Sequence, residues 1–320
     1  MKILANDGIS PSGKAKLESA GFTVVTDTVP QEQLEDAINN EGYIGLLVRS
    51  ATKVRQPLID ACPGLRFVGR GGVGMDNIDV EYARGKGIEV FNTPASSSLS
   101  VAEMVMTQLF TLARGVYDSN RQMPAKGATE FKVLKKKYGK GIELRGKTLG
   151  VVGFGRIGRA VASYALGCGM KVVAYDLYPN DEKIKVDIQG HGTVEVAVPM
   201  VDMDTLLAES DMITLHVPAQ ADGSSVLGAA ELAKCKDGVR LVNTARGGSI
   251  NEDALIEAMA SGKVAAAALD VFVNEPTPRA DLMKHEQLSL TPHIGAATVE
   301  AQDRIGLELA DTIISIMQTA

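Results

Sequence analysis

Residues 149–176 constrain the fold of this chain more than any other stretch of its sequence. The apolar run at 149–152 predicts a buried strand, and Gly153, Gly155 and Gly158 then open a segment with helical apolar periodicity. In a strand, glycine turn and helix of this kind, the first glycine makes the tight turn and the second lets backbone approach a pyrophosphate. The third lets the helix pack against the strand. Unpaired amides at the helix N-terminus favour the phosphates.

A second apolar run, at 172–175, ends on Asp176. A carboxylate there accepts hydrogen bonds from a ribose diol and repels a 2′-phosphate, so the pattern predicts NAD as the cofactor. The chain holds a second glycine pattern, GRGGVG at 69–74, which also follows an apolar run. Its downstream strand ends on Asn92, where a dinucleotide site needs an acid. The glycines after residue 152 are therefore the predicted cofactor loop.

Length, charge and cysteine content narrow the class of protein. A chain of 320 residues favours about two domains, and its net charge of −6 argues against nucleic acid as the main partner. Cys62, Cys168 and Cys235 are odd in number and far apart, so we expect no disulfide framework, no metal site and a reducing, cytoplasmic setting. No apolar run of about 18 residues and no secretory leader are found, so we expect no membrane partner.

The first 94 residues alternate short apolar runs with amphipathic segments, which predicts five strands in a parallel α/β unit. A long helix is predicted at 100–123, with Ser100 as its cap and Glu103 completing a capping box. The segment 125–141 is rich in glycine and lysine, so we expect an exposed loop.

A second α/β unit begins at Lys147 and contains six apolar runs typical of strands. The segment 180–200 has no clear period, and we assign it no role. The helix predicted after Pro292 follows no strand of its own, so we expect it to return to the first unit. The predicted fold class is α/β, with two Rossmann-like, doubly wound parallel-sheet domains. The predicted domains are a discontinuous, flavodoxin-like substrate-binding domain at 1–96 and 293–320 and an NAD-binding Rossmann domain at 97–292.

Polar residues end the apolar runs of the second unit, where open parallel sheets bind their ligands. Hydride transfer from a 2-hydroxy acid to nicotinamide needs an arginine fork for the carboxylate. It also needs a histidine, oriented by a carboxylate, to take the hydroxyl proton. Arg246, His293 and Glu275 supply this set.

Each of these residues also has a plain structural alternative. Arg246 is consistent with a solvated surface charge, Glu275 with a turn residue and His293 with a core histidine. His216 also ends a strand, and we predict that it lines the cofactor groove. The predicted cofactor-binding residues are Gly153, Gly155, Arg156, Ile157, Gly158, Asp176, His216, Pro218, Thr244, Ala245 and Asp270.

Four motifs in order, GVVGFGRIGRAVA, NTARGGSINEDAL, ALDVFVNEP and TPHIGAATVEAQ, resemble the D-isomer-specific 2-hydroxyacid dehydrogenases. The resemblance covers nearly the whole chain. It implies a catalytic triad of Arg246, Glu275 and His293, with Asp270 near the nicotinamide amide. It also implies a homodimer built through the cofactor domain.

The N-terminal pieces VRSATKV, GRGGVGMDNID and NTPASSSLSVAE resemble more narrowly the family members that oxidise 3-phospho-D-glycerate to 3-phosphohydroxypyruvate, the entry to serine biosynthesis. In those members GRGGVG faces the substrate. Ser97 stands where the family usually carries a substrate-holding asparagine, so this departure bears on the choice of substrate and not on the class of reaction. The lysine run near 135 is consistent either with reaching a dimer partner's substrate or with a solvated face. The predicted substrate-binding residues are Arg49, Ser50, Arg70, Gly72, Ser97, Lys135 and Lys136.

Two other functions stay open at this point. One is a glyoxylate or hydroxypyruvate reductase, which shares the same chemistry. The other is an NAD-sensing interaction protein similar to transcriptional corepressors, which keep the same triad. Because the chain stops after the helix that follows His293, we expect no serine-sensing regulatory domain.

Overall fold

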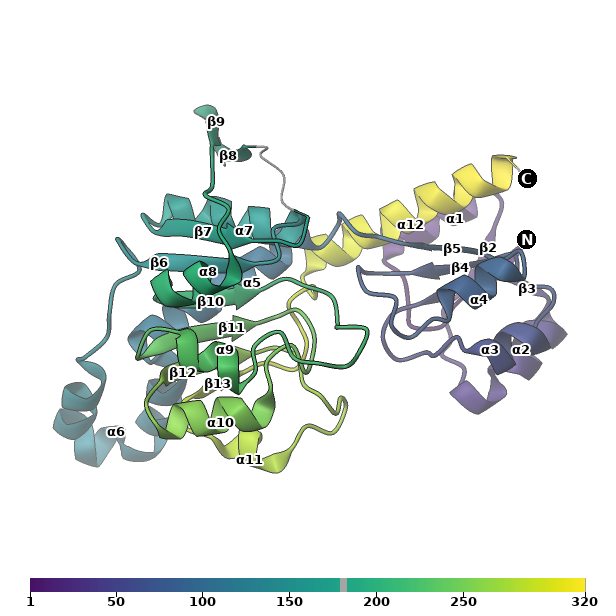
Figure 1. Cartoon of the computed structure of the whole chain (residues 1–320). Coiled ribbons are helices and arrows are strands. Elements are labelled where there is room, and N and C mark those ends of the chain that lie inside the picture. Colours follow the sequence, from purple (N-terminus) through teal and green to yellow (C-terminus); the bar gives the residue numbers. More distant parts are fainter. Residues whose placement is uncertain (179–182, 320) are drawn as a thin grey trace. The chain divides into compact units, whose positions relative to one another are not determined.

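The computed structural model describes residues 1–178 and 183–319, and its chain forms two compact units (Figure 1). The first unit is Met1–Ser98 with Ala296–Ala320, and the second is Leu99–Gly295. These limits differ by two or three residues from the predicted domain limits, and the difference assigns His293 to the second unit. The predicted fold class is confirmed, because both units are parallel sheets with helices on both faces.

The first unit is built on a five-stranded parallel sheet in the order β2-β1-β3-β4-β5. This is the flavodoxin-like order, in which ligands bind at the switch point between β1 and β3. The strands are β1 (Lys2–Ala5), β2 (Thr23–Val25), β3 (Tyr43–Val48), β4 (Phe67–Arg70) and β5 (Glu89–Asn92).

Helices cover both faces of this sheet. On one face lie α2 (Leu34–Glu41), which follows the 3-10 turn η1 (Gln31–Gln33), α3 (Gln56–Ala61) and α4 (Val80–Gly85). On the other face lie α1 (Pro11–Ser19) and the C-terminal helix α12 (Val299–Thr319).

The C-terminal helix α12 joins the first unit because its apolar stripe is buried there. Ala310 and Ile313 pack with Leu17 of α1 and with Phe67 of β4. A Cβ atom on Gly13 of α1 would lie 2.5 Å from the backbone of α12, so the two helices touch backbone to backbone. This contact makes the first unit discontinuous in sequence, as predicted.

The second unit contains the six predicted parallel strands in the order β13-β12-β11-β10-β6-β7. Met200 forms a parallel bridge with Ala174 at the β7 edge, where the Rossmann order 3-2-1-4-5-6 has its third strand. That strand is reduced here to a single bridge. The six strands are β6 (Thr148–Val152), β7 (Lys171–Tyr175), β10 (Met212–Leu215), β11 (Val239–Asn243), β12 (Val264–Leu269) and β13 (Leu288–Leu290).

Both faces of this sheet are covered as well. The helices α5 (Ser98–Arg114) and α7 (Arg156–Gly167) pack on one face. The other face carries α8 (Met203–Glu209), α9 (Ala229–Lys234) and α10 (Glu252–Ala260), with α11 (Ala280–Lys284) beside them.

The segment 180–200, which had no assigned role, forms an antiparallel hairpin of β8 (Ile184–Ile188) and β9 (Gly192–Val196). Its residues 180–182 lie outside the described part of the chain. Ile184 and Val196 face each other across the hairpin, and the base of the hairpin packs on the core beside α7. The period-2 alternation was present in the sequence, but the intervening turn residues masked it.

The predicted helix at 100–123 is helical except at Gly115, which divides it into two helices, and the predicted loop at 125–141 is wrong. The helix α5 begins at Ser98, so Ser100 lies within its first turn and does not cap it. Gly115, with φ of 61°, separates α5 from a second helix, α6 (Val116–Tyr138), which continues through the predicted loop. The backbone bends once inside α6, at Glu130.

Burial and one polar cluster account for the helical state of the lysine-rich segment. Leu134 is buried, so one face of the last turns of α6 has a packing partner. Asp118 accepts hydrogen bonds from Lys137 Nζ and from Tyr138 Oη, both at 2.7 Å, which ties the end of α6 to its beginning. Tertiary contacts of this kind override the weak helix propensity of glycine.

Candidate active site

The three glycines of the predicted cofactor loop differ in backbone conformation and in the atoms that a Cβ atom would meet at each position. Gly153 has φ of 91°, a conformation that glycine adopts without strain, and it turns the chain out of β6. A Cβ atom on Gly158 would lie 2.2 Å from the Gly153 carbonyl oxygen, so helix and turn touch here. Nothing lies within 4 Å of a Cβ atom built on Gly155, which leaves the N-terminus of α7 open to a ligand.

A cavity of about 480 Å³ opens beside this loop, and we call it the glycine-loop pocket. Its lining includes Gly153, Gly155, Asp176, His216 and Pro218. Five of the predicted cofactor residues, drawn from three strands, therefore line one pocket at the carboxyl edge of the sheet.

The carboxylate of Asp176 is held firmly at this pocket. One oxygen accepts the Phe154 N–H at 2.6 Å, and the other accepts the Tyr178 N–H at 2.9 Å. Because each carboxylate oxygen has a second lone pair, the group can still accept hydrogen bonds from the hydroxyl groups of a ribose.

His216 lies in the same pocket in its neutral form. Its Nε2 atom is 3.0 Å from Thr214 Oγ1, and its Nδ1 atom is buried without a partner among the described residues. Withdrawal from water lowers the pKa of His216 to about 3. The ring is thus a poor proton acceptor near neutral pH.

The residues present fit a dinucleotide. The N-terminus of α7 is open for phosphates, and Asp176 is placed for a ribose. Two buried polar atoms, His216 Nδ1 and Thr244 Oγ1, have no partner in the described part of the chain and suit hydrogen bonds from a bound ligand.

The predicted histidine and carboxylate pair is formed directly. His293 Nδ1 lies 2.7 Å from one oxygen of Glu275, and the other oxygen of Glu275 accepts the Phe272 N–H at 2.9 Å. His293 has φ of 56°, a conformation that is rare and strained in residues other than glycine. Its Nε2 atom has no partner in the part of the chain that the structure describes, so it is available to a substrate.

Asp270 holds the loop that carries this histidine. Its Oδ1 accepts the Thr291 hydroxyl at 2.6 Å and the Ile294 N–H at 2.9 Å, and its Oδ2 accepts the Gly295 N–H at 2.8 Å. Asp270 is buried. These bonds show a positioning role for Asp270 that the sequence analysis missed, since it considered this residue only as a cofactor contact.

Arg246 sits in a tightly held turn after β11. Its Nη1 donates to the Ala245 carbonyl at 2.7 Å, and the amide of Asn243 bonds to both Arg246 O and Ala245 N. A Cβ atom on Gly247 would lie 2.0 Å from Phe272 O, so this turn packs against the segment before Glu275. Arg246, Glu275 and His293 thus follow the carboxyl ends of three adjacent strands.

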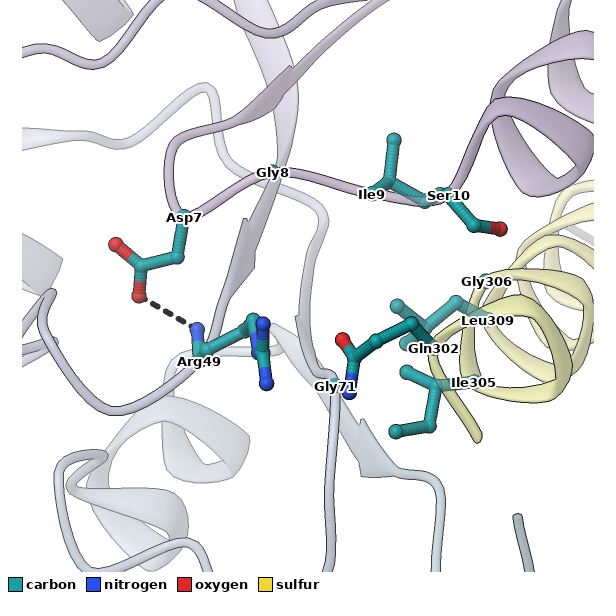
Figure 2. Close-up of a pocket in the computed structure, with 10 residues that line it drawn as sticks. All are labelled: Asp7, Gly8, Ile9, Ser10, Arg49, Gly71, Gln302, Ile305, Gly306 and Leu309. Atoms are coloured by element: carbon teal, nitrogen blue, oxygen red, sulfur yellow. Dashed lines mark hydrogen bonds between the residues drawn. The ribbon is translucent and has the colours of Figure 1, made fainter. Parts of the chain in front are cut away.

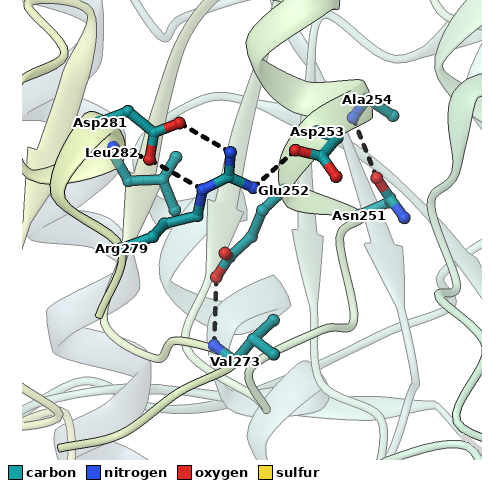
Figure 3. A network of polar contacts seen from close by, with 8 residues as sticks. All are labelled: Asn251, Glu252, Asp253, Ala254, Val273, Arg279, Asp281 and Leu282. Atoms are coloured by element: carbon teal, nitrogen blue, oxygen red, sulfur yellow. Dashed lines mark hydrogen bonds and ion pairs between the residues drawn. The ribbon is translucent and has the colours of Figure 1, made fainter. Parts of the chain in front are cut away.

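A polar network fastens the segment that carries Glu275 to α10 (Figure 3). Arg279 bonds to Asp281 through two nitrogens, at 2.8 and 2.7 Å, and to Asp253 of α10 at 2.6 Å. Glu252 accepts the Val273 N–H at 3.1 Å. The two anchors lie on either side of Glu275 in sequence, which limits its movement.

The first unit contains its own cavity, of about 260 Å³, at the carboxyl edge of its sheet (Figure 2). We call it the Arg49 cavity. Arg49 lines it together with Gln302 and Ile305 of α12 and with Asp7, and no acceptor in the described residues lies within hydrogen-bond distance of its guanidinium. A cation in this state suits an anionic ligand.

The other predicted substrate residues do not line this cavity. A Cβ atom on Gly72 would lie 1.5 Å from Arg70 Nη1, so only glycine leaves room for that guanidinium. Ser97 is buried with its hydroxyl unpaired among the described residues, and Ser50 is exposed. Lys135 and Lys136 belong to the second unit, on the exposed side of α6.

The described residues contain no group of three or more side chains able to hold a metal ion. No described helix is both long and apolar enough to cross a membrane.

A Rossmann-type unit with this pocket, and with arginine, glutamate and histidine after three adjacent strands, is the arrangement that a nicotinamide-dependent dehydrogenase needs. The family model for the D-isomer specific 2-hydroxyacid dehydrogenase, NAD binding domain, matches residues 106–295 of this chain. This chain belongs to the D-isomer-specific 2-hydroxyacid dehydrogenase family, and its cofactor is NAD.

Several relatives support this assignment. The chain is 46% identical to hydroxypyruvate reductase of Thermotoga maritima, over 84% of this chain and 83% of that protein. It is 40% identical to D-3-phosphoglycerate dehydrogenase of Archaeoglobus fulgidus over 99% of this chain, which spans only 57% of that protein. Its structure is similar to that of the TT0316 protein of Thermus thermophilus, with a TM-score of 0.86 and 28% identity over 100% of this chain and 97% of that one.

Proposed function

We propose that this protein oxidises 3-phospho-D-glycerate to 3-phosphohydroxypyruvate with NAD, the entry to serine biosynthesis. The observation that carries the proposal is the guanidinium of Arg49, which lines a cavity of the first unit without an acceptor of its own among the described residues. A chain with net charge −6 would repel a phosphorylated acid unless cations were placed locally.

The residues of the second unit supply the chemistry. Arg246 binds the substrate carboxylate, and His293 Nε2 takes the proton of the 2-hydroxyl group. Glu275 holds the ring through Nδ1, which fixes the tautomer and stabilises the imidazolium that forms. Bound NAD would supply the acceptor for the hydride that leaves C2.

Arg49 and Arg70 of the first unit bind the phosphate in this proposal, and Lys135 and Lys136 assist from a second subunit. The exposure of both lysines supports that role, since neither has an acid partner in the described residues. Lys137 is committed to Asp118 by a 2.7 Å ion pair and is therefore left out.

The test compares a phosphorylated and an unphosphorylated substrate. Loss of one charge-assisted contact costs about 1.5 to 3 kcal/mol, so Arg49→Ala should raise KM for 3-phosphoglycerate more than about tenfold. Its activity on D-glycerate should stay nearly unchanged. Arg55→Ala is the matched control, because Arg55 is bound to Asp79 at the surface of the same unit. Equal losses on both substrates would show that Arg49 binds no phosphate.

Reduction of hydroxypyruvate is the second candidate. The 46% identity to the hydroxypyruvate reductase of Thermotoga maritima favours it. A panel of 3-phosphohydroxypyruvate, hydroxypyruvate and glyoxylate with NADH separates the two functions. A preference of the unmodified enzyme for the unphosphorylated acids would establish the second candidate.

We also propose a homodimer built through the second unit. The proposal is supported by large apolar side chains that are exposed along α5 and α6, since a subunit interface would bury them. They are Leu99, Phe110, Val116, Met123, Phe131 and Val133, with exposed fractions from 40% to 62%.

A cytoplasmic location is part of the same proposal. All three cysteines are free thiols. Burial raises the pKa of the Cys62 and Cys235 thiols to about 11, so neither is a reactive thiolate near neutral pH. A protein of a reducing compartment needs no disulfide among them.

A further inference from the structure

The Arg49 cavity owes its shape to the loop that follows β3. Arg49 begins this loop, which runs to Arg55, and Thr52, which is buried, lies in its middle. The cavity lies where β1 and β3 are neighbours in the sheet. The position of the loop backbone therefore decides where the Arg49 side chain starts.

Asp7, just after β1, accepts hydrogen bonds from two residues of this loop. Its Oδ2 accepts the Arg49 N–H at 2.6 Å and the Thr52 N–H at 3.1 Å, and its Oδ1 accepts the Thr52 hydroxyl at 2.6 Å. Figure 2 shows the bond from the Asp7 carboxylate to the backbone nitrogen of Arg49.

Asn77, from the loop after β4, grips the same segment through its carbonyl groups. Its Nδ2 donates to Arg49 O at 2.8 Å and to Thr52 O at 2.6 Å. Side chains from two different loops thus hold the N–H and the C=O groups of the same two residues.

We propose that Asp7 and Asn77 are positioning residues that set the place of the Arg49 guanidinium for the anionic group of the substrate. The inference rests on the proposed role of Arg49. The negative charge of Asp7 lets a positioning effect be told apart from an electrostatic one, because a carboxylate beside an anion site opposes anion binding. Both of its oxygens instead accept backbone or hydroxyl protons, so its contribution is geometric.

Asp7→Asn separates the geometric from the electrostatic effect. The amide keeps one acceptor oxygen and removes the negative charge. If Asp7 acted only through its charge, the variant would bind 3-phosphoglycerate more tightly. If it positions Arg49, KM for 3-phosphoglycerate should rise about threefold to tenfold, with kcat changed less than about twofold. KM for NAD should not move.

Two further variants provide a second test of the positioning role and a matched control. Asn77→Ala should raise the same KM by a similar factor, and it gives the answer even if Asp7→Asn does not fold. The matched control is Asp202→Asn in the second unit, because Asp202 also accepts a backbone N–H and a threonine hydroxyl, both from Thr205. It should leave KM for 3-phosphoglycerate unchanged.

A double-mutant cycle with Arg49→Ala completes the test. In the Arg49→Ala background, Asp7→Asn should no longer change KM. A persistent effect there, or an unchanged or lower KM in the folded single variants, overturns the inference. If Arg49→Ala itself leaves KM for 3-phosphoglycerate unaltered, the proposed function fails first, and the two failures are told apart.

Discussion

The carboxylate of Asp176 is fixed by two backbone N–H groups before any ligand arrives. Such preorganisation matters for selectivity, because a fixed anion cannot turn away from a 2′-phosphate. The sequence pointed to this residue by its place at the end of an apolar run. The two backbone bonds that hold it depend on the turn of the glycine loop, which spacing alone does not describe.

Cofactor preference tests this residue. Hydrogen bonds from a ribose to a charged acceptor contribute about 1.5 to 3 kcal/mol each, so kcat/KM with NAD should exceed that with NADP at least about tenfold to a hundredfold. Asp176→Ser should narrow the ratio. Equal efficiency of the two cofactors in the unmodified enzyme would remove Asp176 from the ribose site.

His216 predicts a pH dependence of stability. Its folded pKa of about 3 lies below the value of about 6.5 in unfolded chains, so between these values the unfolded state binds a proton that the native state does not. The free energy of unfolding should therefore fall as pH falls from about 6.5 toward 3, by up to about 1.4 kcal/mol per pH unit from this group.

Denaturant unfolding of the wild type and of His216→Asn between pH 7.5 and 5 measures this contribution. The variant should show the shallower slope. His191→Asn, on the exposed hairpin, is the control and should keep the wild-type slope. Identical slopes for all three proteins would show that His216 is accessible to protons in the native state.

At the scale of elements, the turn from β6 into α7 was predicted in order and in function class from its glycines. The lysine-rich segment shows the opposite outcome. Its glycine content predicted a loop, but the segment is helical up to Tyr138. Leu134 is buried, and Asp118 accepts hydrogen bonds from two donors near the end of α6. Neither contact can be predicted from the local sequence. Local propensity determines the secondary structure of a segment only where tertiary packing does not favour another state.

Two glycine variants test the turn. Gly158→Ala puts a Cβ atom 2.2 Å from a backbone oxygen, so it should destabilise the protein by about 1 to 3 kcal/mol. Gly155→Ala meets nothing within 4 Å and should unfold like the wild type, yet bind NAD weakly. Calorimetry of unfolding and NADH fluorescence titration separate the two effects. Equal stability losses in both variants would contradict the division of roles.

At the scale of the whole molecule, the exposed apolar side chains of α5 and α6 lead to a prediction about assembly. Phe131→Glu with Val133→Glu should convert a dimer to monomers, because a charge would be buried without a partner in the interface. Sedimentation velocity measures the mass. The control is Val194→Glu on the hairpin, since this valine has an exposed fraction of 49% and its variant should leave the mass unchanged. A monomeric wild type would refute the homodimer.

The sequence by itself determined the fold class and the cofactor, and it placed the candidate catalytic residues after the ends of strands. Strand ends can be located from apolar runs, and parallel strands place their ends at one edge of a sheet. What the tertiary structure alone decided is how side chains far apart in sequence share hydrogen bonds. Asp270 is bonded to the His293 loop, and Asp7 is bonded to Arg49, 42 residues away. A buried polar residue after an apolar run signals such a role, but its partner depends on which loops the packed sheet brings together.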